Sequence, residues 1–155
     1  MKNDEKNFTE NFDLPLVEEQ EYIRAKKNVT LHNFRKELES DFLRFVKYMW
    51  PEFIEGRHHK DMAEMFNALA DDKVDRLIIN MPPRHTKSEF ASFLLPAWMV
   101  GRKPDLKIIQ TTHTTELAIR FGRKAKTLID SPEYQNIFGT IRSSRFFPKC
   151  MPFFQ

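Results

Sequence analysis

The chain of 155 residues has a single cysteine, Cys150, and no apolar run that approaches the length of a membrane span. One cysteine cannot form an intrachain disulfide, and it excludes a zinc site made of thiolates. A membrane span needs about 20 mostly apolar residues, and the amino-terminus also lacks the apolar core of a signal peptide. We therefore expect a soluble, intracellular protein without membrane contact. No zinc site is predicted, since no cysteine or carboxylate stands at metal-ligand spacing from the five histidines, His32, His58, His59, His85 and His113.

The charges are unevenly distributed, although the net charge is only +3. Residues 1–21 hold seven acidic residues against two basic ones, whereas residues 102–149 hold ten basic residues against four acidic ones. This asymmetry indicates contact with a polyanion near the basic end, or attraction between the acidic tail and the body. Ordinary solvated faces account for the same charges equally well.

Hydrophobic periodicity divides the first half of the chain. Residues 1–28 are polar and without period, which predicts a flexible acidic tail. Residues 29–72 form a predicted helical segment, in which Pro51 ends a first helix and residues 58–70 form a second. The first helix is indicated by a stripe with spacings of three and four: Leu31, Phe34, Leu38, Phe42, Phe45 and Met49.

Two short apolar runs predict strands. Residues 77–79 are too short for a buried helix and too continuous for a one-sided strand, so they indicate a central strand of a covered sheet. Residues 107–111 form the second predicted strand. A helix over residues 88–100, kinked or ended by Pro96, follows the first strand, and a helix capped by Thr114 or Thr115 follows the second. This order predicts an α/β fold with a right-handed βαβ unit and a parallel sheet.

Pro82-Pro83-Arg84-His85-Thr86-Lys87-Ser88 lies between the first predicted strand and its helix. Lys87 and Ser88 match the end of the phosphate-binding pattern G-x-x-x-x-G-K-[ST], whereas Met81 and Thr86 replace its glycines. The strand before the loop and the helix start after it favour phosphate binding. A threonine at position 86 can still present its N–H if φ stays negative there, with a somewhat different loop shape. Arg84 either stabilises charge on a γ-phosphate or pairs with a neighbouring acid.

Residues 79–89 resemble the Walker A segment of tailed-bacteriophage terminase large subunits, in which a P-P-R-x-G/T-K-S loop follows an I-I-N-x strand. The resemblance covers about residues 42–139. Further matching segments are Pro96-Ala97-Trp98, Gly101-Arg102, residues 108–113, Glu116-Leu117-Ala118 and residues 120–124. Trp50-Pro51 and His58-His59 resemble the segment with which that family contacts adenine.

The resemblance implies an ATP-driven motor that pushes double-stranded DNA into a capsid in the host cell cytoplasm. The implied fold is a P-loop NTPase-like parallel sheet with flanking helices, incomplete here: residues 73–140 are a partial core and residues 141–155 an irregular tail. Lys87 would hold the β/γ-phosphates of ATP, Ser88 the Mg²⁺ and Arg84 the γ-phosphate, with His59 or His58 near the adenine. The implied nucleotide site comprises His59, Pro83, Arg84, His85, Thr86, Lys87, Ser88 and Glu89. Thr112 and His113 would lie at the sheet edge where ligands bind.

The family's partners are a portal protein and a small terminase subunit, and the complete motor is a possible homo-oligomer. The family's Walker B strand, which ends in two acids, has no counterpart in this sequence, and we expect the chain to stop before it and before the nuclease domain. Little ATP hydrolysis by this chain alone is therefore expected. The alternative is a non-catalytic module with a vestigial loop, which contacts DNA or the portal through Arg120, Arg123, Lys124 and Lys126. A helicase is disfavoured because helicase-like motifs are absent.

Overall fold

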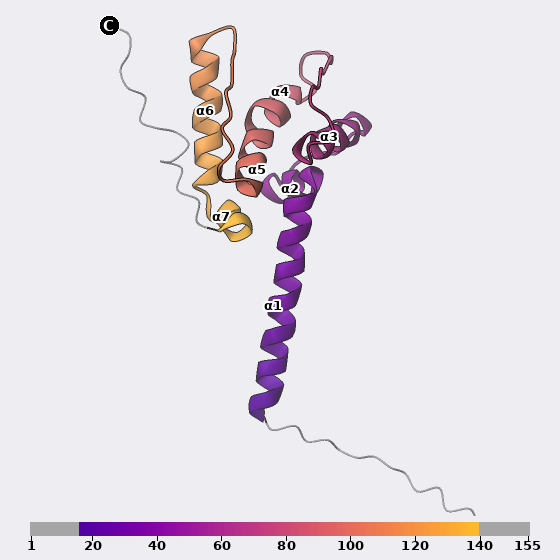
Figure 1. Ribbon diagram of the computed structural model, residues 1–155, viewed down its shortest axis with the longest axis vertical. Helices are drawn as coiled ribbons and strands as arrows, with labels where there is room; N and C mark the ends of the chain where they lie inside the picture. Colours follow the sequence, from indigo (N-terminus) through magenta and orange to yellow (C-terminus); the bar gives the residue numbers. More distant parts are fainter. Residues whose placement is uncertain (1–15, 140–155) are drawn as a thin grey trace, which may run out of the picture. The chain divides into compact units, whose positions relative to one another are not determined.

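The computed structural model describes residues 16–139, in which all regular structure is helical (Figure 1). The chain divides into two compact units, residues 1–33 and 34–155, and the second holds the hydrophobic core. In the described range, no helix is long and apolar enough to cross a membrane. The helices are α1 (Leu16–Ser40), α2 (Phe42–Met49), α3 (Arg57–Ala70), α4 (Lys87–Glu89), the π-helical turn η1 (Phe90–Leu94), α5 (Leu95–Arg102), α6 (Thr115–Ile129) and α7 (Pro132–Phe138).

The predicted parallel sheet is absent from residues 16–139, so the expectation of an α/β fold is wrong for this part of the chain. Figure 1 draws both predicted strands, residues 77–79 and 107–111, as plain chain without arrows. A strand exists only where its N–H and C=O groups pair with a neighbour, and these two segments do not pair with each other. Ile78 is 86% exposed and Ile109 is 92% exposed. Leu77 and Ile79, on either side of Ile78, are half-buried against the core, so the first run is not buried on both faces.

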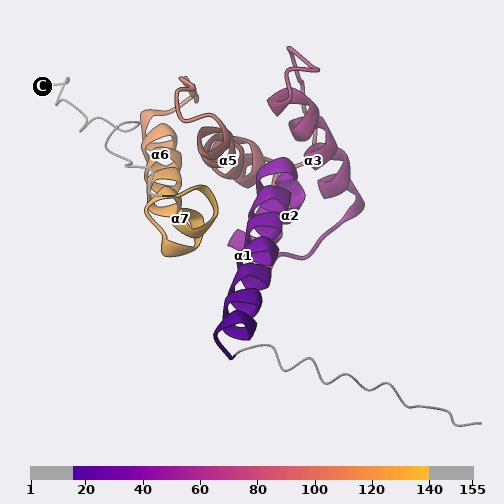
Figure 2. The same ribbon diagram turned by 60° about the horizontal axis from the view of Figure 1, so that its bottom comes forward.

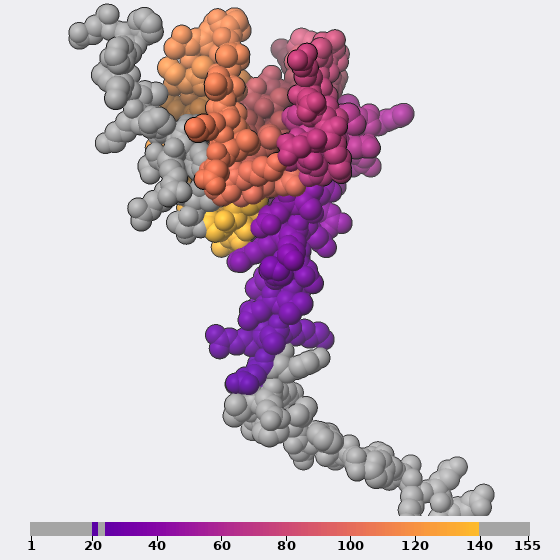
Figure 3. Space-filling model, viewed as in Figure 1, coloured from indigo at the N-terminus to yellow at the C-terminus, as the bar shows by residue number. Residues whose placement is uncertain are grey.

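The second of these segments passes over the outside of the molecule. Residues 107–111 are all exposed, and Figure 3 shows this part of the chain, in orange, at the surface of the face in view. This segment is therefore not a strand of a covered sheet. The physical reason for the error is that a continuous apolar run reports only a tendency to be buried, and pairing partners decide whether it becomes a strand.

The single helix expected up to Met49 is divided in two by Asp41. Asp41 has an extended backbone, and its carboxylate accepts hydrogen bonds from the N–H groups of Leu43 at 2.8 Å and Arg44 at 3.4 Å. An aspartate in this position caps a new helix. Residues 16–28, assigned from the sequence to a tail, lie in α1, while residues 1–15 and 140–155 are outside the described range.

The predicted helix over residues 58–70 is confirmed as α3 (Arg57–Ala70). The spacing predicts an inner face of Met62, Met65, Phe66 and Leu69. Met62 and Phe66 are buried and Leu69 is half-buried, whereas Met65 is 39% exposed. The side-chain oxygen of Asn67 accepts a hydrogen bond from the N–H of Phe42 at 2.9 Å, which joins α3 to the start of α2. The helix is thus fixed to its neighbour by both apolar packing and a polar contact.

The helix predicted over residues 88–100 is confirmed as a helical run from Lys87 to Arg102 that contains the π-helical turn η1. Pro96 has no N–H to donate to the carbonyl of Ser92, and its ring crowds that carbonyl. The widened turn before Pro96 relieves this conflict. The side chain of Gln110 donates a hydrogen bond of 3.0 Å to the Ser92 carbonyl and so replaces the missing donor.

Helices α6 and α7 complete the core of the second unit and lie side by side (Figure 2). Thr114 caps α6, as predicted, and accepts from the N–H of Leu117 at 3.4 Å; α7 was not predicted. The core is a helix-on-helix arrangement. Its largest fully buried side chains are aromatic or aliphatic: Trp98, Tyr134, Phe42, Phe45, Phe66, Phe90, Leu94, Ile129 and Val46.

Candidate phosphate-binding loop

Residues 82–88 connect the extended chain after α3 to the start of α4 (Figure 1). The side chains from Pro82 to His85 are exposed, whereas Thr86 and Lys87 are half-buried. The loop is therefore open to solvent at its tip and anchored at its end. This arrangement leaves the backbone at the tip accessible to a ligand.

The backbone of the loop alternates in handedness. Arg84 has a φ of +66° and Thr86 a φ of +56°, whereas His85 between them is not in the positive-φ region. Alternation of this kind turns successive N–H groups toward one side and forms an anion-binding concavity. Thr86 does not keep the negative φ considered from the sequence; it takes the left-handed conformation that glycine normally supplies, at a cost of about 1–3 kcal/mol for other residues.

The Lys87 side chain reaches back to the beginning of the loop. Its Nζ donates a hydrogen bond of 2.6 Å to the carbonyl oxygen of Met81. An ammonium carries three donors, so two protons remain for other acceptors near the loop. The side chain therefore places a positive charge across the loop, between its first and last residues.

The other predicted nucleotide contacts differ in their surroundings. Arg84 is exposed and forms no salt bridge with any acid in residues 16–139, so the structure gives no support for the pairing alternative. Ser88 is exposed, and the carbonyl of Pro83 contacts His85 Nδ1 at 2.9 Å. Glu89 is engaged elsewhere: both of its oxygens accept from Lys124 Nζ on α6 at 2.8 Å.

His59 on α3 is the buried polar residue nearest to the loop. It is 6% exposed and packs against the rings of Phe53 and Phe90, with centroids 4.8 and 5.1 Å away. Its Nδ1 accepts from the N–H of Gly56 at 2.8 Å, and its Nε2 lies 2.5 Å from Thr86 Oγ1. Burial, followed by the neighbouring charge of His58, lowers the pKa of His59. The contact with Thr86 was missed from the sequence, which suggested only an adenine contact.

Two further histidines surround this contact. The ring of His58 lies 3.8 Å from that of His59 and 5.6 Å from that of His85, centroid to centroid. His58 Nε2 is buried and has no hydrogen-bond partner in the described part of the chain. No group of histidines and carboxylates that could hold a metal ion occurs among residues 16–139. The three histidines therefore lie together beside the loop, with His59 buried, His58 half-buried and His85 exposed.

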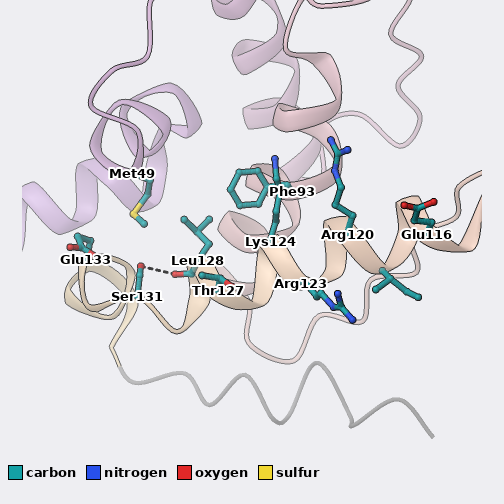
Figure 4. A pocket seen from close by; sticks show the side chains of 11 residues that line it. Met49, Phe93, Glu116, Arg120, Arg123, Lys124, Thr127, Leu128, Ser131 and Glu133 are labelled. Atoms are coloured by element: carbon teal, nitrogen blue, oxygen red, sulfur yellow. Dashed lines mark hydrogen bonds between the residues drawn. The ribbon is translucent and has the colours of Figure 1, made fainter. Parts of the chain in front are cut away.

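A cavity of about 1010 Å³ lies along α6 and does not include the loop. Figure 4 shows Phe93 beside Lys124, with Arg120 and Arg123 further along the same helix. Neither Arg120 nor Arg123 forms a salt bridge with a described acid. Of the four cations predicted for this basic face, only Lys124 is paired, with Glu89; Arg120, Arg123 and Lys126 form no salt bridge within residues 16–139.

Thr112 and His113 do not lie at a sheet edge, since the described range has no sheet. The hydroxyl of Thr112 donates to the carbonyl of Thr114 at 2.7 Å, and His113 is exposed. They therefore form the turn that leads into α6. The prediction that they border a ligand site depended on this sheet edge and loses its basis without it.

Comparisons with protein-family models, with curated proteins and with solved structures found no match to this chain. The function of the loop is therefore argued from its own residues and geometry. The resemblance of residues 79–89 to the terminase segment stays a prediction, and the roles that it implies are proposals.

Proposed function

We propose that residues 82–88 bind the phosphates of Mg-ATP and that the chain is the ATP-binding part of a DNA-packaging motor of the terminase type. The observation that carries this proposal is the alternating backbone at Arg84 and Thr86, directly before Lys87. Such a backbone directs N–H groups toward an anion. The sequence resemblance of residues 79–89 supplies the choice of ATP among phosphate ligands.

Each side chain of the loop has a role in this proposal. The Lys87 ammonium, held at the Met81 carbonyl, binds the β/γ-phosphates with its remaining protons. The exposed hydroxyl of Ser88 contacts Mg²⁺, and the unpaired Arg84 guanidinium contacts the γ-phosphate. Glu89 is less suited to a ligand contact than the sequence suggested, because its carboxylate is paired with Lys124.

Binding and turnover are separate expectations. Water attack on the γ-phosphate needs an acid that orients the water and a second Mg²⁺ contact. No run of four apolar residues followed by two acids occurs in this sequence. We therefore propose that this chain binds Mg-ATP with little hydrolysis. DNA translocation, and contacts with a portal protein and a small subunit in the host cytoplasm, belong to the complete motor.

Isothermal titration of the folded protein with Mg-ATP tests the site. Lys87→Ala removes a charge-assisted hydrogen bond worth about 1.5–3 kcal/mol, so the affinity should fall by roughly 10- to 150-fold. Lys107→Ala is the matched control, because Lys107 is an exposed lysine outside the loop. Absence of binding by the folded wild-type protein, or equal binding by Lys87→Ala, would contradict the proposal.

A second candidate function is non-catalytic binding of DNA or a portal protein along α6. The unpaired and exposed guanidinium groups of Arg120 and Arg123 favour it. In this case DNA affinity would fall steeply with salt and would decrease in Arg120→Ala and Arg123→Ala, while Lys87→Ala would not change it. Binding that is indifferent to salt would count against this candidate.

A further inference from the structure

A directed chain of hydrogen bonds runs from α3 into the loop. The N–H of Gly56 can only donate, so His59 Nδ1 is the acceptor of their 2.8 Å contact. A neutral imidazole with an accepting Nδ1 carries its proton on Nε2, and this proton points to Thr86 Oγ1 at 2.5 Å. The Thr86 hydroxyl then donates to the carbonyl of His85 at 2.7 Å. The donor and the acceptor of each of these three hydrogen bonds are thereby assigned.

This series of hydrogen bonds ends at Thr86, whose left-handed backbone is unusual for a residue other than glycine. A β-branched residue with a φ of +56° is strained, and Thr86 is the position that forms the second half of the anion-binding concavity. Its side chain is held from both sides, by the buried ring of His59 and by the carbonyl of His85. Thr86 and His59 are 27 positions apart in the sequence, so the contact is tertiary rather than local.

We infer that His59 is a positioning residue, which holds Thr86 in the left-handed conformation that the phosphate-binding loop requires; this inference rests on the proposed function. His59 does not touch the phosphate itself. Its hydrogen bond stabilises Thr86 in a conformation that a glycine would adopt at this position without such help. Gly56 belongs to the same device, since a Cβ on it would lie 2.9 Å from the ring of His58 and 3.4 Å from His59 Nδ1.

The hydrogen bonds that join Gly56, His59 and Thr86, called the clamp below, require a neutral His59. A proton on Nδ1 would meet the Gly56 N–H and break the first hydrogen bond of the chain. The titratable groups that act on His59 are Glu55, which favours its cation, and His58 and His85, which oppose it. Glu55 is itself paired with Lys47 and Lys60. The lowered pKa of His59 keeps the clamp complete above pH 6.5, and the clamp is lost as the pH falls through that lowered value.

Two substitutions separate the hydrogen bonds of the two imidazole nitrogens. His59→Asn keeps an acceptor near the position of Nδ1 and loses the hydrogen bond to Thr86, whereas His59→Gln places an amide donor near the position of Nε2. Mg-ATP affinity should fall about tenfold in His59→Asn, the effect of one hydrogen bond of about 1.4 kcal/mol. His59→Gln should recover most of it.

The pH dependence gives a separate test. The ratio of the wild-type affinity for Mg-ATP to that of His59→Gln should decline below pH 6.5. Protonation of the nucleotide affects both proteins equally, so it cancels in this ratio.

Changes at Thr86 test the purpose of the clamp. Thr86→Val keeps the shape and removes the hydroxyl, so it should weaken Mg-ATP binding about as much as His59→Asn. Thr86→Gly adopts the left-handed conformation without help, so it should bind at least as well as the wild type. Adding His59→Asn to Thr86→Gly should then cost little, a coupling that a merely structural histidine would not show.

A measurement without nucleotide separates this inference from the proposed function. A strong NMR cross-peak between the amide and α protons of Thr86 reports its positive φ, and it should weaken in Thr86→Val and in folded His59→Asn. An unchanged cross-peak, or an equal loss of affinity from His59→Asn in the Thr86→Gly background, would overturn the inference. If the cross-peak behaves as expected but the wild type binds no Mg-ATP, the proposed function fails and the clamp remains.

Discussion

Tyr134 brings a phenol hydroxyl into an aromatic core. Its OH donates a hydrogen bond of 2.7 Å to the carbonyl of Ala97, and the ring packs against Phe138 and Phe45. Tyr134→Phe keeps the ring and leaves this carbonyl without its side-chain donor. We expect a loss of about 1–2 kcal/mol in the free energy of unfolding, measured by urea denaturation. An unchanged midpoint and slope would contradict the assigned role of the hydroxyl.

The same residue gives the molecule a sensitivity to alkaline pH. Burial raises the pKa of Tyr134 far above its usual value of about 10. A group with a raised pKa in the folded state contributes stability that is complete below about pH 10 and is lost as the pH rises further. Urea denaturation of the wild type between pH 9 and pH 11 should therefore show a decline that is smaller in Tyr134→Phe.

Single residues also show what the sequence can reveal about the site. Lys87 and Ser88 are candidate site residues because their spacing is a chemical pattern that is visible in the local sequence. The left-handed conformation of Thr86 was not found, because threonine disfavours it and the cause lies 27 residues away in His59. The pairing of Glu89 with Lys124 across 35 positions was missed for the same reason. Tertiary contacts that override local preference leave no periodic signal.

At the scale of elements, Asp41 decides where one helix ends and the next begins. Its carboxylate accepts from two N–H groups at the start of α2. Asp41→Ala should lower the free energy of unfolding by about 1 kcal/mol, the usual cost of losing an N-cap. Asp61→Ala is the control, since Asp61 is an exposed acid inside α3, and such surface changes stay within about 0.5 kcal/mol. Equal effects in thermal or urea unfolding would show that the cap is not the cause.

The helices were the predictable elements. Spacings of three and four predicted helices over residues 58–70, over residues 88–100 and after Thr114 or Thr115, and all three are present, because an amphipathic stripe reports its own period. The two proposed strands failed, because a strand depends on a partner that its own residues do not specify. The break at Asp41 shows a third case: the stripe from Leu31 to Met49 continues through it, and only the cap chemistry marks the boundary.

At the scale of the whole second unit, the core is built from helices that pack aromatic side chains against one another. Phe42 contacts the rings of Phe66, Phe90 and Trp98, with centroids between 5.2 and 5.5 Å away. Trp98 adds a hydrogen bond of 3.0 Å from its ring N–H to the carbonyl of Leu38. These residues come from α1, α2, α3, η1 and α5. The abundance of phenylalanine in the sequence thus finds a structural role in this core.

The contact between α5 and α7 in this unit depends on Gly101. A Cβ at Gly101 would lie 2.6 Å from ring atoms of Phe138, and that ring is held by Phe45 and Tyr134. Gly101→Ala should therefore cost about 1–3 kcal/mol through overpacking. Gly122 in α6 is the matched control, because a Cβ there meets no atom within 4 Å.

Replacing glycine by alanine inside a helix stabilises it by about 0.5–1 kcal/mol when nothing clashes. The same substitution should thus have opposite signs at the two positions, with Gly122→Ala raising the urea midpoint and Gly101→Ala lowering it. Because the two changes add the same methyl group to helices of the same unit, their difference isolates the packing of Phe138. A stabilising Gly101→Ala would mean that α7 does not pack on α5 in solution.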